Sequence, residues 1–276
     1  MKSMNSAAQP MLALRATAIE NARTARISAL RMTSAAKTSH IGSCLSVIDV
    51  LATLFAIKHT EIMRSKDNII LSKGHAAAAL YSVLDSMELL ELNLTDYCKN
   101  GSQLYGHINH HVSSEIPLST GSLGHGLPFG LGMALAEQKI GSQSRTYVIV
   151  SDGELNEGTT WESALVAGHH RLKNLTVIID RNRIQSLGFT EEINSLDPIA
   201  PKWDAFGWAT IEINGHDIDA IVGALNEEYE KPLCIIANTV KGKGVSFMEN
   251  TLEWHYQSAS PEELSAALLE VSENNS

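Results

Sequence analysis

Short apolar runs alternate along this chain with longer segments whose apolar residues recur at helical spacing. The runs predict buried strands, because they are rich in β-branched residues and end in small or polar ones. They lie at 68–71, 148–150, 177–179, 209–213 and 233–237. Helical spacing is found at 12–32, 46–58, 126–138 and 218–229, and an alanine-rich helix is expected after His75. Strands that alternate with helices predict an α/β fold with three layers, α/β/α, around a mostly parallel sheet.

The same pattern predicts how the chain is divided. Residues 1–10 are expected to form a flexible tail and residues 11–276 a single domain, since neither an internal repeat nor a linker interrupts them. The sequence from Ser260 to Glu263 has the form of a capping box with proline at the first helical position, which predicts a last helix. Residues 98–125 show little periodicity, and a loop of that length in a compact domain is usually functional.

Composition and charge narrow the class of protein. A net charge of −10 argues against nucleic-acid binding, and no apolar window looks transmembrane. The N-terminal segment has the charged residues of an amphipathic helix and lacks the form of a signal peptide. The three cysteines, Cys44, Cys98 and Cys234, have neither metal-ligand spacing nor the pattern of a disulfide framework, so a cytoplasmic location is expected.

Two of the predicted strands are followed by residues that can bind a cation. Asp152 follows the strand at 148–150, and Asn182 follows the next strand along the chain. In an open α/β sheet, ligands bind at the carboxyl ends of the strands. Carboxylate and amide oxygens suit a hard divalent cation, which commonly also binds phosphate oxygens. The unit therefore predicts a metal-assisted diphosphate site; the alternative is an ordinary strand–helix–strand crossover with polar turns.

This unit resembles the thiamine diphosphate motif, Gly-Asp-Gly followed later by Asn, with Ser151 in place of the first glycine. Together with further motifs in the same order and rough spacing, it is similar to the N-terminal half of transketolases, over residues 15 to 257. The further motifs are Ser39-His40-Ile41-Gly42, Ser72-Lys73-Gly74-His75, Tyr105-Gly106-His107, Thr120-Gly121-Ser122-Leu123-Gly124-His125-Gly126, and Lys241-Gly242-Lys243-Gly244 with Trp254-His255.

The resemblance implies that the chain binds thiamine diphosphate and Mg²⁺, or Ca²⁺ or Mn²⁺ in its place. It implies that the metal is held by the side chains of Asp152 and Asn182 and by the backbone carbonyl of Ile184. It also implies a set of residues around the cofactor, with Gly153 at the diphosphate, two residues packing on the rings and an internal glutamate nearby. The cofactor-binding residues are His75, Gly121, Leu123, Gly153, Glu157 and Asn182.

Four histidines match catalytic positions of the family: His40, His75, His107 and His255. Neutral imidazoles can donate, accept and relay protons near pH 7, as the movement of a two-carbon ketol unit requires. Isoleucine follows both His40 and His107, where the family often has proline, so the loops that carry these two histidines depart from the pattern. Lys241 and Lys243 are expected in a solvated turn.

The resemblance covers only half of a full-length transketolase. It implies a second subunit that carries the pyrimidine-binding and C-terminal domains, with the cofactor bound between unlike chains in an α2β2 heterotetramer. The expected activity is transfer of a two-carbon ketol unit from a ketose phosphate to an aldose acceptor. The alternatives are the α subunit of a thiamine-dependent 2-oxo acid dehydrogenase, a 1-deoxyxylulose-5-phosphate synthase fragment and a non-catalytic cofactor-binding remnant.

Overall fold

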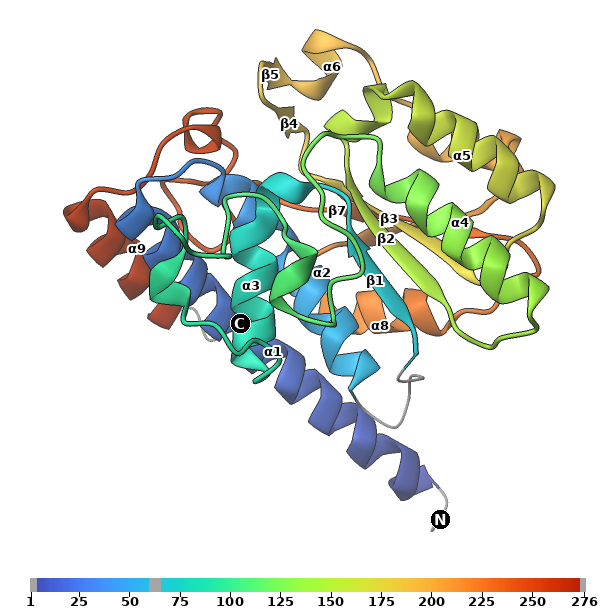
Figure 1. Ribbon diagram of the computed structural model, residues 1–276, viewed down its shortest axis with the longest axis horizontal. Helices are drawn as coiled ribbons and strands as arrows, with labels where there is room; N and C mark the ends of the chain where they lie inside the picture. Colours follow the sequence, from blue (N-terminus) through green and yellow to red (C-terminus); the bar gives the residue numbers. More distant parts are fainter. Residues whose placement is uncertain (1–3, 60–65, 274–276) are drawn as a thin grey trace.

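A five-stranded parallel sheet forms the centre of the protein (Figure 1). The computed structural model describes residues 4–59 and 66–273. The strands occur in the order β1-β2-β3-β7-β6, and every neighbouring pair is parallel. Each of the five predicted strands is confirmed. Their bounds are β1 Asn68–Leu71, β2 Thr146–Ser151, β3 Leu175–Arg181, β6 Ala209–Asn214 and β7 Leu233–Asn238.

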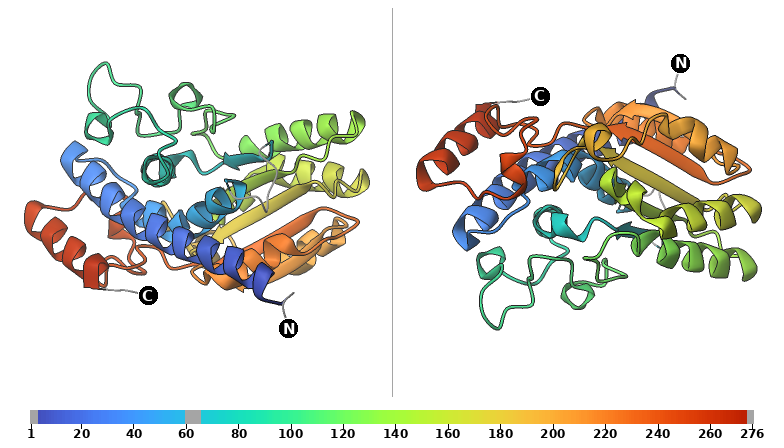
Figure 2. Two further views of the ribbon diagram at one scale, coloured as in Figure 1. Left: turned by 90° about the horizontal axis from the view of Figure 1, so that it is seen from below. Right: turned by 90° about the horizontal axis from the view of Figure 1, so that it is seen from above.

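Helices cover both faces of this sheet, which confirms the three-layer α/β/α architecture (Figure 2). Alternate residues of a strand point to opposite faces. Tyr147 and Ile149 of β2 accordingly join one apolar core, and Val148 and Val150 join the other. The first core contains residues of α1 Met4–Ala36, α2 Ile41–Lys58, α3 Ala77–Ser86, α8 Ile218–Asn226 and α9 Pro261–Glu273. The second contains residues of α4 Gly126–Lys139, α5 Gly158–His169 and α7 Ile199–Ala205.

Short elements lie between these helices and strands, mostly near the carboxyl ends of the strands. Residues 98–125 form the expected long loop, which holds one single-turn helix. After β3 the chain makes a small antiparallel hairpin and one turn of helix that stand above the sheet in Figure 1. The short elements are η1 Gly74–Ala76, η2 Leu94–Asp96, η3 His110–Val112, η4 Gly153–Asn156, η5 Glu253–His255, β4 Ile184–Gln185, β5 Gly188–Phe189 and α6 Thr190–Ile193.

The helix boundaries differ from the sequence-based expectation at several ends. Helix α1 begins at Met4, within the stretch expected to be a tail, and residues 1–3 lie outside the described residues. Helix α8 ends at Asn226 rather than 229. The capping box before α9 is confirmed, because the Ser260 N–H donates to the Glu263 carboxylate (2.8 Å) and the Glu263 N–H donates to Ser260 Oγ (3.2 Å).

Helix α2 is the most buried helix of the fold. It has the length and mean hydropathy of a membrane span, contrary to the expectation that no window looks transmembrane. Within the protein, however, 94% of that window is buried, as in the core helix of a soluble domain. Every residue from Ile41 to Ile57 is buried, so no polar face marks where the helix starts. The first turn, Ile41–Leu45, therefore has no periodic signal and lies outside the range that helical spacing predicts.

Candidate active site

A cavity of about 210 Å³ lies at the carboxyl ends of β2 and β3. It brings together residues from separate segments of the chain. Nine of the eleven predicted site residues line it: His40, His75, His107, Leu123, Asp152, Gly153, Asn182, Ile184 and His255. Gly121 lies just behind this lining, where an added Cβ would be 3.5 Å from the His107 ring. Glu157 lies elsewhere, on the surface at the start of α5.

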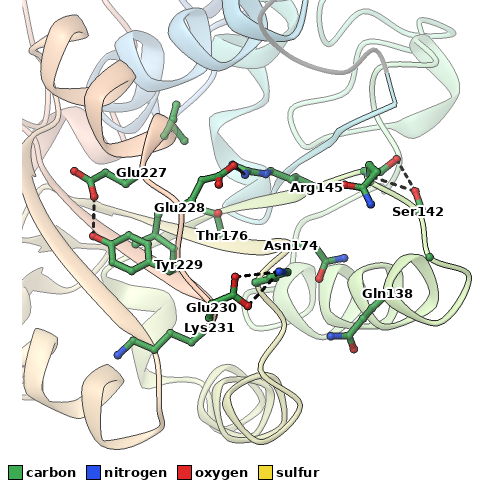
Figure 3. A pocket seen from close by; sticks show the side chains of 16 residues that line it. Gln138, Ser142, Arg145, Asn174, Thr176, Glu227, Glu228, Tyr229, Glu230 and Lys231 are labelled. Atoms are coloured by element: carbon green, nitrogen blue, oxygen red, sulfur yellow. Dashed lines mark hydrogen bonds and ion pairs between the residues drawn. The ribbon is translucent and has the colours of Figure 1, made fainter.

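A larger cavity of about 420 Å³ lies at the opposite, amino ends of the strands (Figure 3). Four of its charged side chains form two ion pairs: Arg145 contacts Glu228 at 3.3 Å, and Lys173 contacts Glu230 at 3.1 Å. None of the predicted site residues lines this cavity. We therefore assign the chemistry to the smaller cavity, where polar groups from distant segments converge.

Asp152 and Asn182 are held in place by backbone N–H groups. The Asp152 carboxylate accepts hydrogen bonds from Gly153 N (2.8 Å) and Arg183 N (2.5 Å), and Asn182 Oδ1 accepts one from Ile184 N (3.1 Å). Burial, together with the nearby charge of Asp180, raises the pKa of Asp152 to about 6. A cation next to this carboxylate would stabilise its ionised form. The carboxylate, the amide and the Ile184 carbonyl therefore fit a hard divalent metal such as Mg²⁺.

Two lysines close to these groups, Lys73 and Lys241, are fully buried. Lys73 forms an ion pair with Asp180, which also accepts hydrogen bonds from Ser46 Oγ (2.7 Å) and Thr239 Oγ1. Burial alone would raise the pKa of Asp180, but the charge of Lys73 and the hydrogen bonds hold it below its usual range. Because Asp180 is paired within the protein, it anchors the lysine and is less available to a bound metal.

Lys241 does not lie in a solvated turn, so that expectation is wrong for this residue. Its side chain is fully buried, and Nζ donates to the Ile184 carbonyl (3.1 Å) and lies 2.7 Å from His255 Nδ1. Burial, and then the charge of Lys73, lowers the pKa of Lys241 to about 7. Lys243 is 40% exposed near Glu249, in agreement with the expectation. One feature of the sequence could have indicated this buried position. Lys241 follows the end of β7, and β7 pairs with β3.

The four predicted histidines form one cluster. The His40 ring centroid lies 5.3 Å from that of His75, 6.0 Å from that of His107 and 5.1 Å from that of His255. Burial lowers the pKa of His40 to about 4 and that of His255 to about 3, with nearby charges adding to the effect, and lowers that of His75 well below its usual value. These three rings are therefore neutral near pH 7, although the catalytic roles of the four histidines remain predictions.

Hydrogen bonds fix the two histidine loops that lack the family's proline. His40 has a left-handed backbone with φ 77°, and its N–H donates to the His255 carbonyl at 2.9 Å. The Tyr81 hydroxyl donates to the His107 carbonyl (3.1 Å) and accepts from the Asn109 N–H (2.9 Å). These hydrogen bonds restrict the backbone of the two loops, as proline would do at the positions after His40 and His107.

A glutamate that was not among the predicted site residues, Glu154, is buried in the turn after β2. The Glu154 carboxylate is completely buried and accepts hydrogen bonds from Ser72 Oγ, from Gly124 N (2.8 Å) and from Ser151 N (3.4 Å). The η4 turn directs Glu154 inward and leaves Glu157 exposed as the N-cap of α5, so the place of Glu157 near the cofactor stays a prediction. Glu154 thus joins three loops around the cavity.

Ser151 fits this arrangement without backbone strain. It is not among the described residues with positive φ, so glycine is not required at this position. Its hydroxyl accepts a hydrogen bond from the Glu154 N–H at 3.2 Å. The departure from the Gly-Asp-Gly motif therefore adds a contact to the turn.

The chain matches the family described as transketolase, thiamine diphosphate binding domain, over residues 17–269. It is 39% identical over 251 residues to one of the subunits of the apulose-4-phosphate transketolase of Phocaeicola vulgatus, covering 86% of this chain and 88% of the relative. It is 39% identical over 241 residues to the 6-deoxy-6-sulfo-D-fructose transketolase subunit SqwG of a Clostridium species, covering 84% and 88%.

One-chain transketolases match over part of their length. Human transketolase is 35% identical over 246 residues, which cover 86% of this chain and 39% of the human protein. A crystal structure of transketolase from Campylobacter jejuni has a TM-score of 0.84 and 28% identity, with 94% of this chain and 43% of that chain covered. These matches favour the transketolase family over the 2-oxo acid dehydrogenase and synthase alternatives. The chain belongs to the transketolase family and contains its thiamine diphosphate-binding domain.

Proposed function

We propose that this chain is the thiamine diphosphate-binding subunit of a two-subunit transketolase. The reaction is transfer of a two-carbon ketol unit from a ketose phosphate to an aldose or aldose phosphate. The observation that carries the proposal is the convergence of four histidines on the cavity that also contains Asp152 and Asn182. Two relatives named as transketolase subunits, which this chain matches over most of their length, support it.

The polar end of the cavity is suited to the cofactor and its metal. Asp152, Asn182 and the Ile184 carbonyl would hold Mg²⁺, or Ca²⁺ or Mn²⁺, between the protein and the diphosphate. Lys73 and Lys241 place positive charge close to these groups, through their contacts with Asp180 and the Ile184 carbonyl. When bound, thiamine diphosphate supplies the carbon chemistry for breaking and forming the carbon–carbon bond. The chain contributes the metal site, the orientation of the cofactor and the exclusion of water.

The histidines supply groups that can move protons next to the cofactor. A neutral imidazole ring offers one N–H donor and one nitrogen acceptor. Lys241, as an ammonium, donates to His255 Nδ1, which assigns the proton of the neutral ring to Nε2. His255 can therefore donate a hydrogen bond to a sugar hydroxyl or a developing alkoxide through Nε2. His40, His75 and His107 lie close enough to share in binding the same part of the substrate.

The chain alone is expected to be inactive in ketol transfer. The names of its relatives as subunits support a partner, and we propose that this partner carries the pyrimidine-binding and C-terminal domains. The check is a coupled assay of the purified chain with thiamine diphosphate, Mg²⁺, xylulose 5-phosphate and a panel of other ketose phosphates, with and without the partner. Robust turnover by the chain alone would contradict the two-subunit proposal, and activity only in the mixture would support it.

We also propose an α2β2 assembly in the cytoplasm. Exposed apolar side chains of α4 and α5 offer a surface on which two copies of this chain can pack. They are Phe129, Leu165 and Val166.

The proposed location rests on the three cysteines, which are free, as suits a reducing compartment. The sedimentation mass of the reconstituted complex tests the stoichiometry, and fractionation of native cells tests the location.

Glu154 gives a further prediction for this site. In Glu154→Gln, one acceptor oxygen is replaced by an NH₂ group, and a charge-assisted hydrogen bond is worth about 1.5–3 kcal/mol. We expect thiamine diphosphate to bind roughly ten- to a hundredfold more weakly in the presence of Mg²⁺, because the Gly124 and Ser72 loops lose their common anchor. Calorimetric titration measures this affinity. The matched control is Glu162→Gln, at an exposed position of α5, and equal affinities in the two variants would contradict the positioning role of Glu154.

A further inference from the structure

A histidine outside the cofactor cavity has both of its ring nitrogens paired. His216 lies in the turn after β6, and its side chain is only 10% exposed. Its Nδ1 lies 2.7 Å from a carboxylate oxygen of Asp49 in α2. Its Nε2 accepts a hydrogen bond from the Val240 N–H, just past the end of β7, at 2.8 Å. The ring therefore joins α2 to the segments that follow β6 and β7.

These contacts define the protonation of the ring. Asp49 also forms an ion pair with Arg26 of α1. Burial alone would raise the pKa of Asp49, but the charge of Arg26 and the hydrogen bond from His216 hold that pKa at about 2. An ionised carboxylate can only accept, so Nδ1 of His216 carries a proton. Because a backbone N–H can donate only to an unprotonated nitrogen, Nε2 carries none, and the ring is the neutral Nδ1–H tautomer.

The backbone group that His216 holds leads directly to Lys241. Val240 starts the turn after β7, and its carbonyl accepts from the Lys243 N–H at 3.2 Å. On the other side of Lys241, the Gly242 N–H donates to a carbonyl of α2 at 3.0 Å. The backbone of Lys241 is thus held from both neighbours, and on the Val240 side the partner is a side chain, that of His216.

The place of the Lys241 backbone decides where its buried Nζ lies. That Nζ is 2.7 Å from His255 Nδ1. We propose that His216 is a positioning residue for His255 in ketol transfer. It holds Val240, which fixes the backbone of Lys241, and the Lys241 ammonium orients the ring of His255. His216 does not line the cavity, so it acts only through these residues. This inference rests on the two-subunit function proposed above.

Two amide substitutions separate the two contacts of His216. In His216→Gln the amide oxygen can take the place of Nε2 and accept from the Val240 N–H. In His216→Asn the shorter amide can take the place of Nδ1 and donate to Asp49, but Val240 loses its acceptor. We expect His216→Asn to lower kcat/KM for the ketose donor about tenfold, because small displacements of a catalytic group reduce rates strongly. His216→Gln should retain most of the activity.

A double variant shows whether His216 acts through His255. In the absence of the His255 ring, His216→Asn has nothing left to misplace. The variant His216→Asn with His255→Ala should therefore have the kcat/KM of His255→Ala alone, whereas independent effects would multiply. The control for local loss of stability is Asp217→Ala, which removes the N-cap of α8 at the next residue and should keep the wild-type kcat/KM.

The histidine rings can also be observed in the chain alone, without substrate or partner. In ¹⁵N NMR spectra, His216 should appear as the neutral Nδ1–H tautomer, and this signal should be missing in His216→Gln. The Nδ1 shift of His255 should move in His216→Asn and stay near its wild-type value in His216→Gln. A proton on Nε2 of His216, or a His255 shift that is the same in all three proteins, would overturn the proposal.

The kinetic outcomes separate this role from the proposed function. If the reconstituted wild type transfers no ketol unit, the two-subunit function fails and the role of His216 fails with it. If the wild type is active and His216→Asn is equally active, the function stands and the positioning role is wrong. Equal losses in the Asn and Gln variants, or multiplied losses in the double variant, also contradict it. A loss confined to His216→Asn that disappears in the His255→Ala background supports it.

Discussion

Asp152→Ala is expected to abolish metal-dependent binding of thiamine diphosphate, and Asn182→Ala to do the same. Each change removes one of the oxygen atoms that we propose as ligands of the divalent cation, and a hard cation prefers such ligands. The pocket offers few substitutes, because the nearby carboxylate of Asp180 is already paired with Lys73. We expect the dissociation constant for the cofactor to rise by about a hundredfold or more, as the loss of roughly 3 kcal/mol implies. Calorimetric titration with Mg²⁺, and again with a chelator, measures it.

A strand-end aspartate outside the cavity provides the control. Asp217 follows β6 and caps α8, where its carboxylate accepts from the Asp219 N–H (3.0 Å) and the Ala220 N–H (3.1 Å). Asp217→Ala should cost about 1 kcal/mol of stability through loss of the cap and leave cofactor affinity unchanged. Unchanged affinity in both Asp152→Ala and Asn182→Ala would mean that the motif is only a structural turn.

The sheet, and the edge at which Asp152 and Asn182 meet, were predictable because each depends on short-range pattern. Parallel strands buried on both faces appear as apolar runs, and topology then brings their carboxyl ends to one edge. Asp152 and Asn182 each follow such a run, so their common location follows from the fold. The histidine cluster is different. His40, His107 and His255 lie in three loops, and only the resemblance to transketolases indicated that they belong together.

Residues whose role depends on side-chain direction were not predictable from the pattern. Glu154 and Glu157 lie three positions apart after the same strand, and the η4 turn decides which one is buried. Lys241 and Lys243 alternate in one glycine-containing turn, yet one is fully buried and the other is 40% exposed. Charge and glycine content suggested a solvated turn for both lysines. The buried acceptors of Lys241, the Ile184 carbonyl and His255, come from other segments of the chain.

The second large effect concerns substrate chemistry and should be separable from cofactor binding. His107 and His255 line the same cavity as Asp152, Asn182 and Ile184, the proposed metal ligands. We expect His107→Ala and His255→Ala to leave the affinity for thiamine diphosphate nearly unchanged. Both should lower kcat/KM for the ketose donor, by about 10²–10⁴-fold where the histidine is a positioned acid–base group and by less where it only contacts a hydroxyl.

The structure predicts a difference between these two variants. His255→Ala also removes the acceptor that lies 2.7 Å from Lys241 Nζ. The His107 ring centroid lies 6.0 Å from that of His40, and a Cβ added at Gly121 would be 3.5 Å from the His107 ring. His255→Asn, whose side-chain amide can still accept a hydrogen bond from Lys241, should therefore recover part of the loss, and His107→Asn should recover less. Steady-state kinetics of the reconstituted enzyme decide the matter, with the exposed His170→Ala as control. If His107→Ala and His255→Ala both kept the wild-type kcat/KM for every ketose and 2-oxo acid tried, the cluster would be structural and the proposed activity would lose its main support.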